Sequence, residues 1–115
     1  MACVLIADDN RQMAEVLRAS LEDAGYEVLT AYSGLAAVAC VEQNEVELAV
    51  LDVLMPGISG DAVAERLHQI NPKLPVVLMT GADRAFAAVS GLPVLRKPFP
   101  HEELVALVHQ LLLDE

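Results

Sequence analysis

The sequence predicts an α/β fold in which a five-stranded parallel sheet carries helices on both faces. Stretches with a strand-like apolar pattern alternate with stretches of helical periodicity five times along the chain, and this alternation is typical of parallel sheets. Hydrophobic residues make up 55% of the chain and aromatic residues only 3%, which suits an aliphatic core between a small sheet and its helices. The 115 residues are enough for one domain with one core, and we expect a single domain over residues 1–115.

The clearest strand covers residues 48–52, where an uninterrupted aliphatic run ends at Asp52 and a Pro56-Gly57 turn follows. Such a run predicts a strand buried on both faces of a parallel sheet. The other strands are expected at residues 2–7, 26–31, 75–80 and 94–96.

Helical periodicity predicts helices at residues 11–24, 33–43 and 59–70, a short one at 83–90, and a last one that begins at His101. Ser33 is a suitable N-cap for the second helix, and Gly25 is a suitable stop after the first. We expect the buried side of the second helix to carry Leu35, Val38, Ala39 and Val41.

The formal net charge of −10 comes from 17 acidic and 7 basic side chains. It disfavours direct nucleic-acid binding, which needs a basic face, but allows a divalent cation. The sequence shows no signal peptide and no apolar run near the roughly 18 residues of a membrane span, so no membrane insertion is expected. Cys3 and Cys40 have neither metal-site nor disulfide spacing, and we expect buried, reduced thiols and a cytoplasmic protein.

Charged or hydroxyl-bearing residues stand at the ends of four predicted strands. They are Asp8 and Asp9, Asp52, Thr80 and Lys97. The carboxyl ends of parallel strands share one edge of the sheet, where ligands bind in such folds, and converging carboxylates repel one another unless a cation joins them. Oxygen ligands of this kind suit Mg²⁺ beside a phosphate, and Lys97 and Thr80 then become partners for the anion.

Each of these residues also has an ordinary explanation. A strand-terminal Asp52 can be a turn former, Thr80 a β-branched strand residue and Lys97 a solvated charge, while Asp8-Asp9 can cap the first helix. Their common placement at one edge favours the functional interpretation.

This set of residues at the strand ends resembles the CheY-like receiver domain of two-component response regulators, and the resemblance covers the whole chain. The matching stretches are Ile6-Ala7-Asp8-Asp9-Asn10, Leu51-Asp52-Val53-Leu54-Met55-Pro56-Gly57, Met79-Thr80-Gly81 and Arg96-Lys97-Pro98-Phe99. The resemblance implies a doubly wound, flavodoxin-like sheet of order 2-1-3-4-5. It also implies a phosphoacceptor in signal transduction rather than a turnover enzyme. The segment before Lys97 is similar to receivers of hybrid sensor histidine kinases.

By this resemblance, Asp52 accepts a phosphoryl group from a histidine kinase or a histidine phosphotransfer protein. Asp8, Asp9 and Asp52 hold Mg²⁺ together with the backbone carbonyl of Leu54, and Mn²⁺ can substitute. Thr80 and Lys97 then bind the phosphoryl oxygens, and phosphorylation switches the surface around the fourth and fifth strands. The Lys97-Pro98 bond is expected to be cis.

The chain departs from the family in two places that concern the readout of phosphorylation, and a separate inference concerns the lifetime of the phosphoryl group. The segment from Thr80 to Lys97 is shorter than is typical of receivers. Receivers usually carry an aromatic residue where this chain has Val94, so the usual threonine-aromatic relay is not expected. By the resemblance, Leu54 and Ala82, which stand two residues after Asp52 and Thr80, flank the path of the attacking water. Neither can orient a water molecule, which predicts slow hydrolysis of phospho-Asp52.

Three other functions compete with this one. A phosphatase of the haloacid dehalogenase type needs a second acid two residues after its nucleophile, where Leu54 stands. A flavodoxin-like cofactor site must accept a phosphate in its first loop, which Asp8-Asp9 would repel. An inert receiver-like scaffold would be expected to lack part of the site, and all of its residues are present.

Overall fold

The computed structural model describes residues 1–81 and 91–113 as a parallel sheet between two helical layers. The sheet has the order β2-β1-β3-β4-β5, and all of its neighbouring strands are parallel. The fold class and strand order expected from the sequence are confirmed. The strands are β1 (Cys3–Ala7), β2 (Glu27–Ala31), β3 (Leu48–Asp52), β4 (Val76–Thr80) and β5 (Val94–Arg96), and the helices are α1 (Arg11–Asp23), α2 (Gly34–Gln43), α3 (Gly60–Ile70) and α5 (His101–Leu113).

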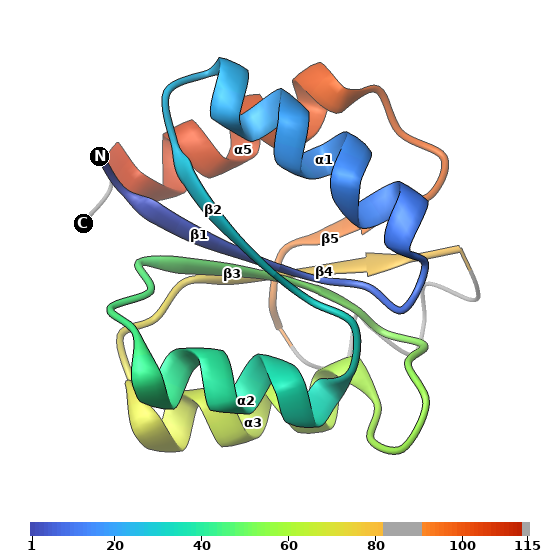
Figure 1. Ribbon diagram of the computed structural model, residues 1–115, viewed down its shortest axis with the longest axis vertical. Helices are drawn as coiled ribbons and strands as arrows, with labels where there is room; N and C mark the ends of the chain where they lie inside the picture. Colours follow the sequence, from blue (N-terminus) through green and yellow to red (C-terminus); the bar gives the residue numbers. More distant parts are fainter. Residues whose placement is uncertain (82–90, 114–115) are drawn as a thin grey trace.

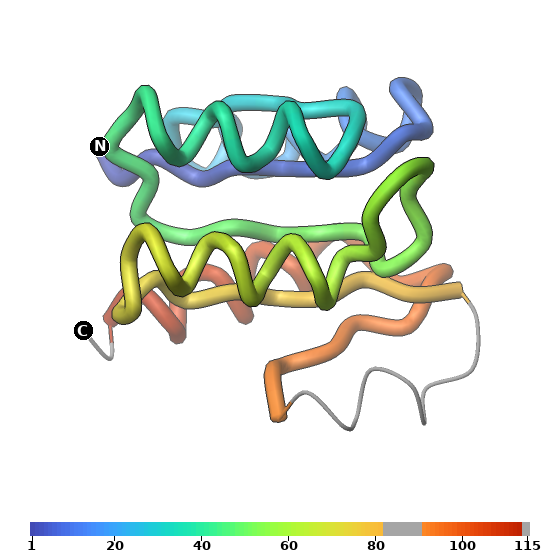
Figure 2. The backbone as a smooth tube through the Cα atoms, turned by 90° about the horizontal axis from the view of Figure 1, so that it is seen from below, coloured from blue at the N-terminus to red at the C-terminus, as the bar shows by residue number. Residues whose placement is uncertain are grey.

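The helices cover the two faces of the sheet in pairs. Figure 1 shows α1 and α5 on one face and α2 and α3 on the other. Figure 2, seen from below, shows the β3 and β4 segments running side by side with the α3 segment over them. The segment at residues 83–90, predicted as a short helix, lies outside the described residues.

Alternate residues of the central strands build two separate hydrophobic cores. Leu5 of β1 and Leu51 of β3 pack with α2 and α3, whereas Ile6 and Val50 pack with α1 and α5. All five residues of β1, of β3 and of β4 are buried. This two-sided burial is the reason that these strands are continuous aliphatic runs rather than alternating ones.

Side-chain caps fix where the first two helices begin. Asn10 Oδ1 accepts a hydrogen bond from the Met13 amide at 3.1 Å, and Ser33 Oγ accepts one from the Ala36 amide at 3.1 Å. Each cap satisfies an amide that the first helical turn leaves without a partner. Ser33 therefore caps as predicted, and Asn10 rather than Asp8 or Asp9 caps α1.

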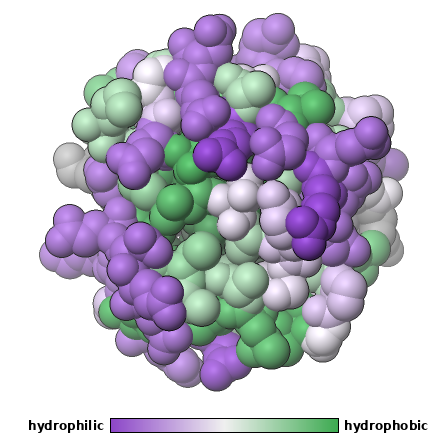
Figure 3. Space-filling model, viewed as in Figure 1, coloured by the Kyte–Doolittle hydropathy of each residue, from purple (hydrophilic) through white to green (hydrophobic). Residues whose placement is uncertain are grey.

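The predicted buried side of α2 was wrong at Leu35, which is 65% exposed, and Ala39 is only half-buried. The buried residues of the helix are Gly34, Ala37, Val38 and Val41. The helix is turned so that Gly34 lies against Ile58 and Val63, and this close contact points Leu35 to solvent. The space-filling view shows apolar residues at the surface over α2 (Figure 3).

The two cysteines differ in burial. Both thiols are free, but Cys3 is buried and Cys40 is half-buried, so the expected burial holds for Cys3 alone. Among the described residues, no helix is both long and apolar enough to cross a membrane.

Candidate functional site

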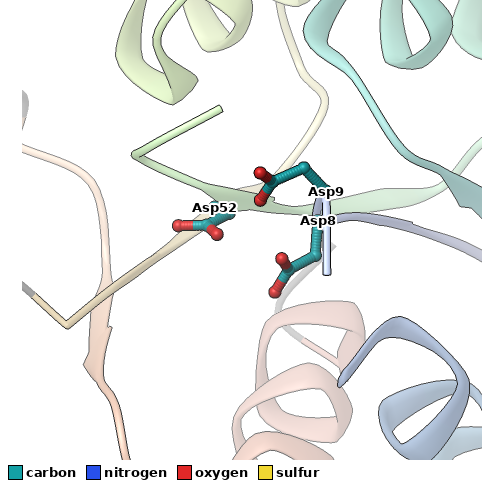
Figure 4. A group of neighbouring side chains, drawn as sticks. All are labelled: Asp8, Asp9 and Asp52. Atoms are coloured by element: carbon teal, nitrogen blue, oxygen red, sulfur yellow. The ribbon is translucent and has the colours of Figure 1, made fainter. Parts of the chain in front are cut away.

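Three aspartates meet at the carboxyl-terminal edge of the sheet. Asp8 and Asp9 follow β1, and Asp52 ends β3. Ala7 is the register partner of Leu51. The residues that come next, Asp8 and Asp52, therefore stand at the same level of the sheet. One carboxylate oxygen from each lies within 4.8 Å of the others, and Figure 4 shows the three side chains gathered there. Asp8 and Asp52 are buried and Asp9 is exposed, so the cluster opens to solvent on the Asp9 side.

Lys97 joins two of these carboxylates. Its ammonium group donates to Asp8 Oδ2 at 2.9 Å and to Asp52 Oδ2 at 3.1 Å. The loop between β5 and α5 that carries Lys97 is anchored to β4, because the Lys97 amide donates to the Thr80 carbonyl at 2.8 Å. The Lys97-Pro98 bond is cis, as predicted.

The second oxygen of each buried carboxylate accepts a hydrogen bond from the backbone. Asp52 Oδ1 accepts from the Leu54 amide at 3.2 Å, and Asp8 Oδ1 accepts from the Asn10 amide at 2.9 Å. Both carboxylates are therefore held at both oxygens, which fixes their orientation toward each other. The Leu54 side chain is 62% exposed at the rim of the site.

Burial and the ion pairs of Lys97 act in opposite directions on the pKa values of Asp52 and Lys97. Burial raises the pKa of Asp52 above its ordinary value, and the negative charge of Asp8 adds to the rise, while Lys97 opposes it. Burial would lower the pKa of Lys97, but its hydrogen bond to Asp8 and the charges of Asp52 and Asp8 outweigh burial and raise that pKa. Lys97 is thus held as a cation between two acids, one of which is costly to ionise.

The donor set fits a hard divalent cation. Carboxylate oxygens are ligands that Mg²⁺ prefers. This ion usually keeps several of its water molecules and is bound by one or two carboxylates. Two buried acids would supply fixed oxygens, and the exposed Asp9 leaves room for water. Lys97 neutralises only part of the negative charge of the cluster, so the site can attract a further cation.

A model of the family described as the response regulator receiver domain matches residues 4–109. The chain belongs to this family. The general function of receiver domains is to accept a phosphoryl group in two-component signalling.

Known relatives and solved structures agree with this assignment. The response regulator MprA of Mycobacterium sp. (strain KMS) is 37% identical over 95% of this chain and 50% of its own length. The chain thus spans about half the length of the curated relatives it matches. The response regulator TrrA of Thermotoga maritima, solved in complex with Mg²⁺-BeF, is 30% identical with a TM-score of 0.89, over 96% of this chain and 99% of that one.

The fold match extends to more distant receivers. A CheY-like receiver domain protein of Methanospirillum hungatei superimposes with a TM-score of 0.92 at 24% identity, over 99% of this chain and 95% of that chain. The likeness at this identity shows the fold.

The structure of this receiver domain brings Thr80 to the same edge. Thr80 is the last residue of β4, is buried, and lies opposite Arg96 of β5. Val94, which stands where receivers usually carry an aromatic residue, lines a groove of about 430 Å³ between β5 and α5. Ala82 lies outside the described residues.

The role of Asn10 at the site was not predicted from the sequence. This residue caps α1 with its side chain and holds Asp8 with its amide, so it joins a helix start to a site carboxylate. The signal was present in the sequence, because an Asn directly before a helical pattern is a typical N-cap.

Proposed function

We propose that Asp52 is the phosphoacceptor of this receiver domain and that the donor is a phosphohistidine protein. The observation that supports this most directly is the placement of the Asp52 carboxylate, buried at a strand end between Asp8 and Lys97. In the transfer, an Asp52 oxygen forms a bond to phosphorus as the phosphorus–nitrogen bond of the donor histidine breaks. The imidazole leaves with that electron pair.

Asp8, Asp9 and Asp52, with the Leu54 carbonyl, would hold Mg²⁺, and Mn²⁺ can take its place. The ion supplies neutralisation of the charge on the phosphoryl oxygens. Lys97 already donates to Asp52, and its ammonium group turns to the phosphoryl oxygens once Asp52 is esterified. The Thr80 hydroxyl is the further donor to those oxygens, and its movement biases the surface of β4 and β5.

A groove beside the acid cluster suits the donor protein. It has a volume of about 830 Å³ and runs along α1 from Asn10. The apolar side chains of Met13 and Val16 line it together with the polar residues Arg11, Gln12, Glu15 and His101. Val16 is 43% exposed. An apolar strip beside a charged acceptor favours docking of a protein helix rather than of a small substrate. The chain itself would not bind nucleic acid, since its net charge is −10.

The site favours a phosphoacceptor over a phosphatase that acts on external substrates. The residue two positions after Asp52 is Leu54, whose exposed side chain has no group that could act as a general acid or base.

Incubation with acetyl phosphate and Mg²⁺, followed by intact mass, tests this function. We expect a gain of one phosphoryl group in the wild type, and no gain in Asp52→Asn or after chelation of the metal. Absence of any gain with acetyl phosphate and with a phosphohistidine protein would favour an inert scaffold instead.

A further inference from the structure

The first residue of α3 touches the backbone of the acceptor. Gly60 is buried, and a Cβ atom placed on it would lie 2.8 Å from Val53 Cα and 2.9 Å from the Asp52 carbonyl carbon, and closer still to the Asp52 carbonyl oxygen. Contacts below 3.0 Å essentially do not occur for real Cβ atoms. Because the atoms it would meet belong to the backbone, no side-chain rotation could relieve the clash.

A hydrogen bond also holds Gly60 close to the end of β3. The Gly60 amide donates to the Val53 carbonyl at 2.8 Å. The Ser59 side chain makes no capping hydrogen bond at the start of α3, so this bond satisfies an amide that the first turn would leave unpaired. The chain therefore leaves β3 after Asp52, turns through residues 53–59, and returns to the residue beside Asp52.

We propose that Gly60 is a positioning residue for phosphorylation, an inference that rests on the function proposed for Asp52. By lacking a side chain, it lets α3 press against the backbone at residues 52 and 53. That contact sets where the Asp52 carboxylate stands relative to Lys97 at 3.1 Å and to the Leu54 amide at 3.2 Å. A side chain at residue 60 must push α3 and the acceptor apart by a few tenths of an ångström or more, and phosphoryl transfer is sensitive to such misplacement.

Gly34 provides a matched control on the neighbouring helix. It is the first residue of α2 as Gly60 is of α3, and a Cβ on it would lie 2.6 Å from Ile58 Cγ1 and 2.7 Å from Val63 Cγ2. The contacts at Gly34 also fall below 3.0 Å, but they are made with side chains and involve no residue of the acid cluster. Gly34→Ala thus crowds the side chains of Ile58 and Val63 but makes no direct clash with the backbone of Asp52.

The test compares Gly60→Ala with Gly34→Ala in three measurements: urea unfolding, Mg²⁺ affinity by calorimetry, and the rate of labelling by acetyl phosphate at saturating Mg²⁺. We expect Gly60→Ala to lower the labelling rate about tenfold and to weaken Mg²⁺ binding several-fold. Gly34→Ala should keep both within about twofold of the wild type even where it loses as much stability. A folded Gly60→Ala that labels at the wild-type rate would overturn the proposal, as would equal losses of rate in the two variants.

A measurement on the wild type covers the case in which Gly60→Ala does not fold. In a ¹H–¹⁵N spectrum, saturating Mg²⁺ should shift the Gly60 amide, since it bonds to the residue beside Asp52, and should leave the Gly34 amide in place. A Gly60 amide that stays unmoved while the Leu54 amide shifts would contradict the proposal. If the wild type takes up no phosphoryl group, the function proposed for Asp52 fails, whereas the Mg²⁺ affinities still test the placement of Asp52 by Gly60.

Discussion

The ammonium group of Lys97 donates a hydrogen bond to Asp52 Oδ2 at 3.1 Å, across 45 positions of the sequence. The same nitrogen also bonds to Asp8, so one cation links the proposed acceptor to a proposed metal ligand. In the proposed transfer, Lys97 would stabilise the carboxylate before the reaction and the phosphoryl oxygens after it.

Replacement of Lys97 should separate phosphorylation from metal binding. In Lys97→Ala we expect labelling by acetyl phosphate to slow about a hundredfold, because one donor to the developing charge is lost. Mg²⁺ should bind at least as tightly as in the wild type, since a positive charge has left the acid cluster. Labelling rate and calorimetry check the two effects, with the exposed Lys73→Ala as control. Weaker Mg²⁺ binding in Lys97→Ala would argue against this role.

The stability of the metal-free protein should depend on pH through Asp52. Burial and Asp8 raise the pKa of Asp52 in the folded state, so protonated Asp52 favours folding. That stability is fully present below the pKa of the unfolded chain and is lost as pH rises through the folded-state pKa. Asp52→Asn mimics the protonated form. Without metal, its melting temperature should match the wild type in acid and exceed it near neutral pH.

Urea or thermal unfolding in a chelator, at several pH values, measures this difference. A wild type that gains stability relative to Asp52→Asn as the pH rises would show that Lys97 outweighs burial. Added Mg²⁺ should reduce the difference, because the ion stabilises the ionised carboxylates.

Phospho-Asp52 should hydrolyse slowly. The exposed Leu54 side chain at the rim of the site cannot orient a water molecule, and Ala82, the second residue for which this role is expected from the sequence, has no polar side-chain group either. Leu54→Asn should shorten the lifetime of the label several-fold, because an amide can hold the attacking water. Loss of the label from the purified wild type within seconds would contradict this prediction.

Docking of a phosphohistidine donor should depend on the apolar strip of α1. Val16→Glu should slow transfer from a histidine phosphotransfer protein about tenfold or more, because it replaces an apolar contact of the docking groove with a charge. Labelling by acetyl phosphate should stay unchanged. Ile70→Glu is a matched control, since Ile70 on α3 is 42% exposed and Val16 is 43% exposed. Equal effects of the two variants on transfer would exclude a specific role for the α1 groove.

The sequence predicted which residues meet at the carboxyl edge of the sheet better than it predicted which side of α2 is buried. Asp8, Asp52 and Lys97 could be placed together because parallel strands bring their carboxyl ends to one edge. Leu35 could not be assigned correctly, because α2 is apolar nearly all round and its periodicity leaves the buried side open. The contact of Gly34 with Ile58 and Val63 decides that side, and such a contact exists only in the folded chain.

The contact between Gly60 and the backbone of Asp52 escaped prediction for a related reason. A glycine at the start of a helix is an ordinary feature of sequence. Only the return of α3 to β3 shows that a Cβ atom would not fit there.

The most direct test of the central claim is the location of the phosphoryl group. After labelling with Mg²⁺ and a phosphohistidine protein, reduction with borohydride converts an aspartyl phosphate to homoserine, which peptide mass spectrometry locates. We predict homoserine at position 52 and no other converted aspartate. Conversion at Asp8 or Asp9 instead, or a label that persists in Asp52→Asn, would contradict the assignment of Asp52 as the acceptor.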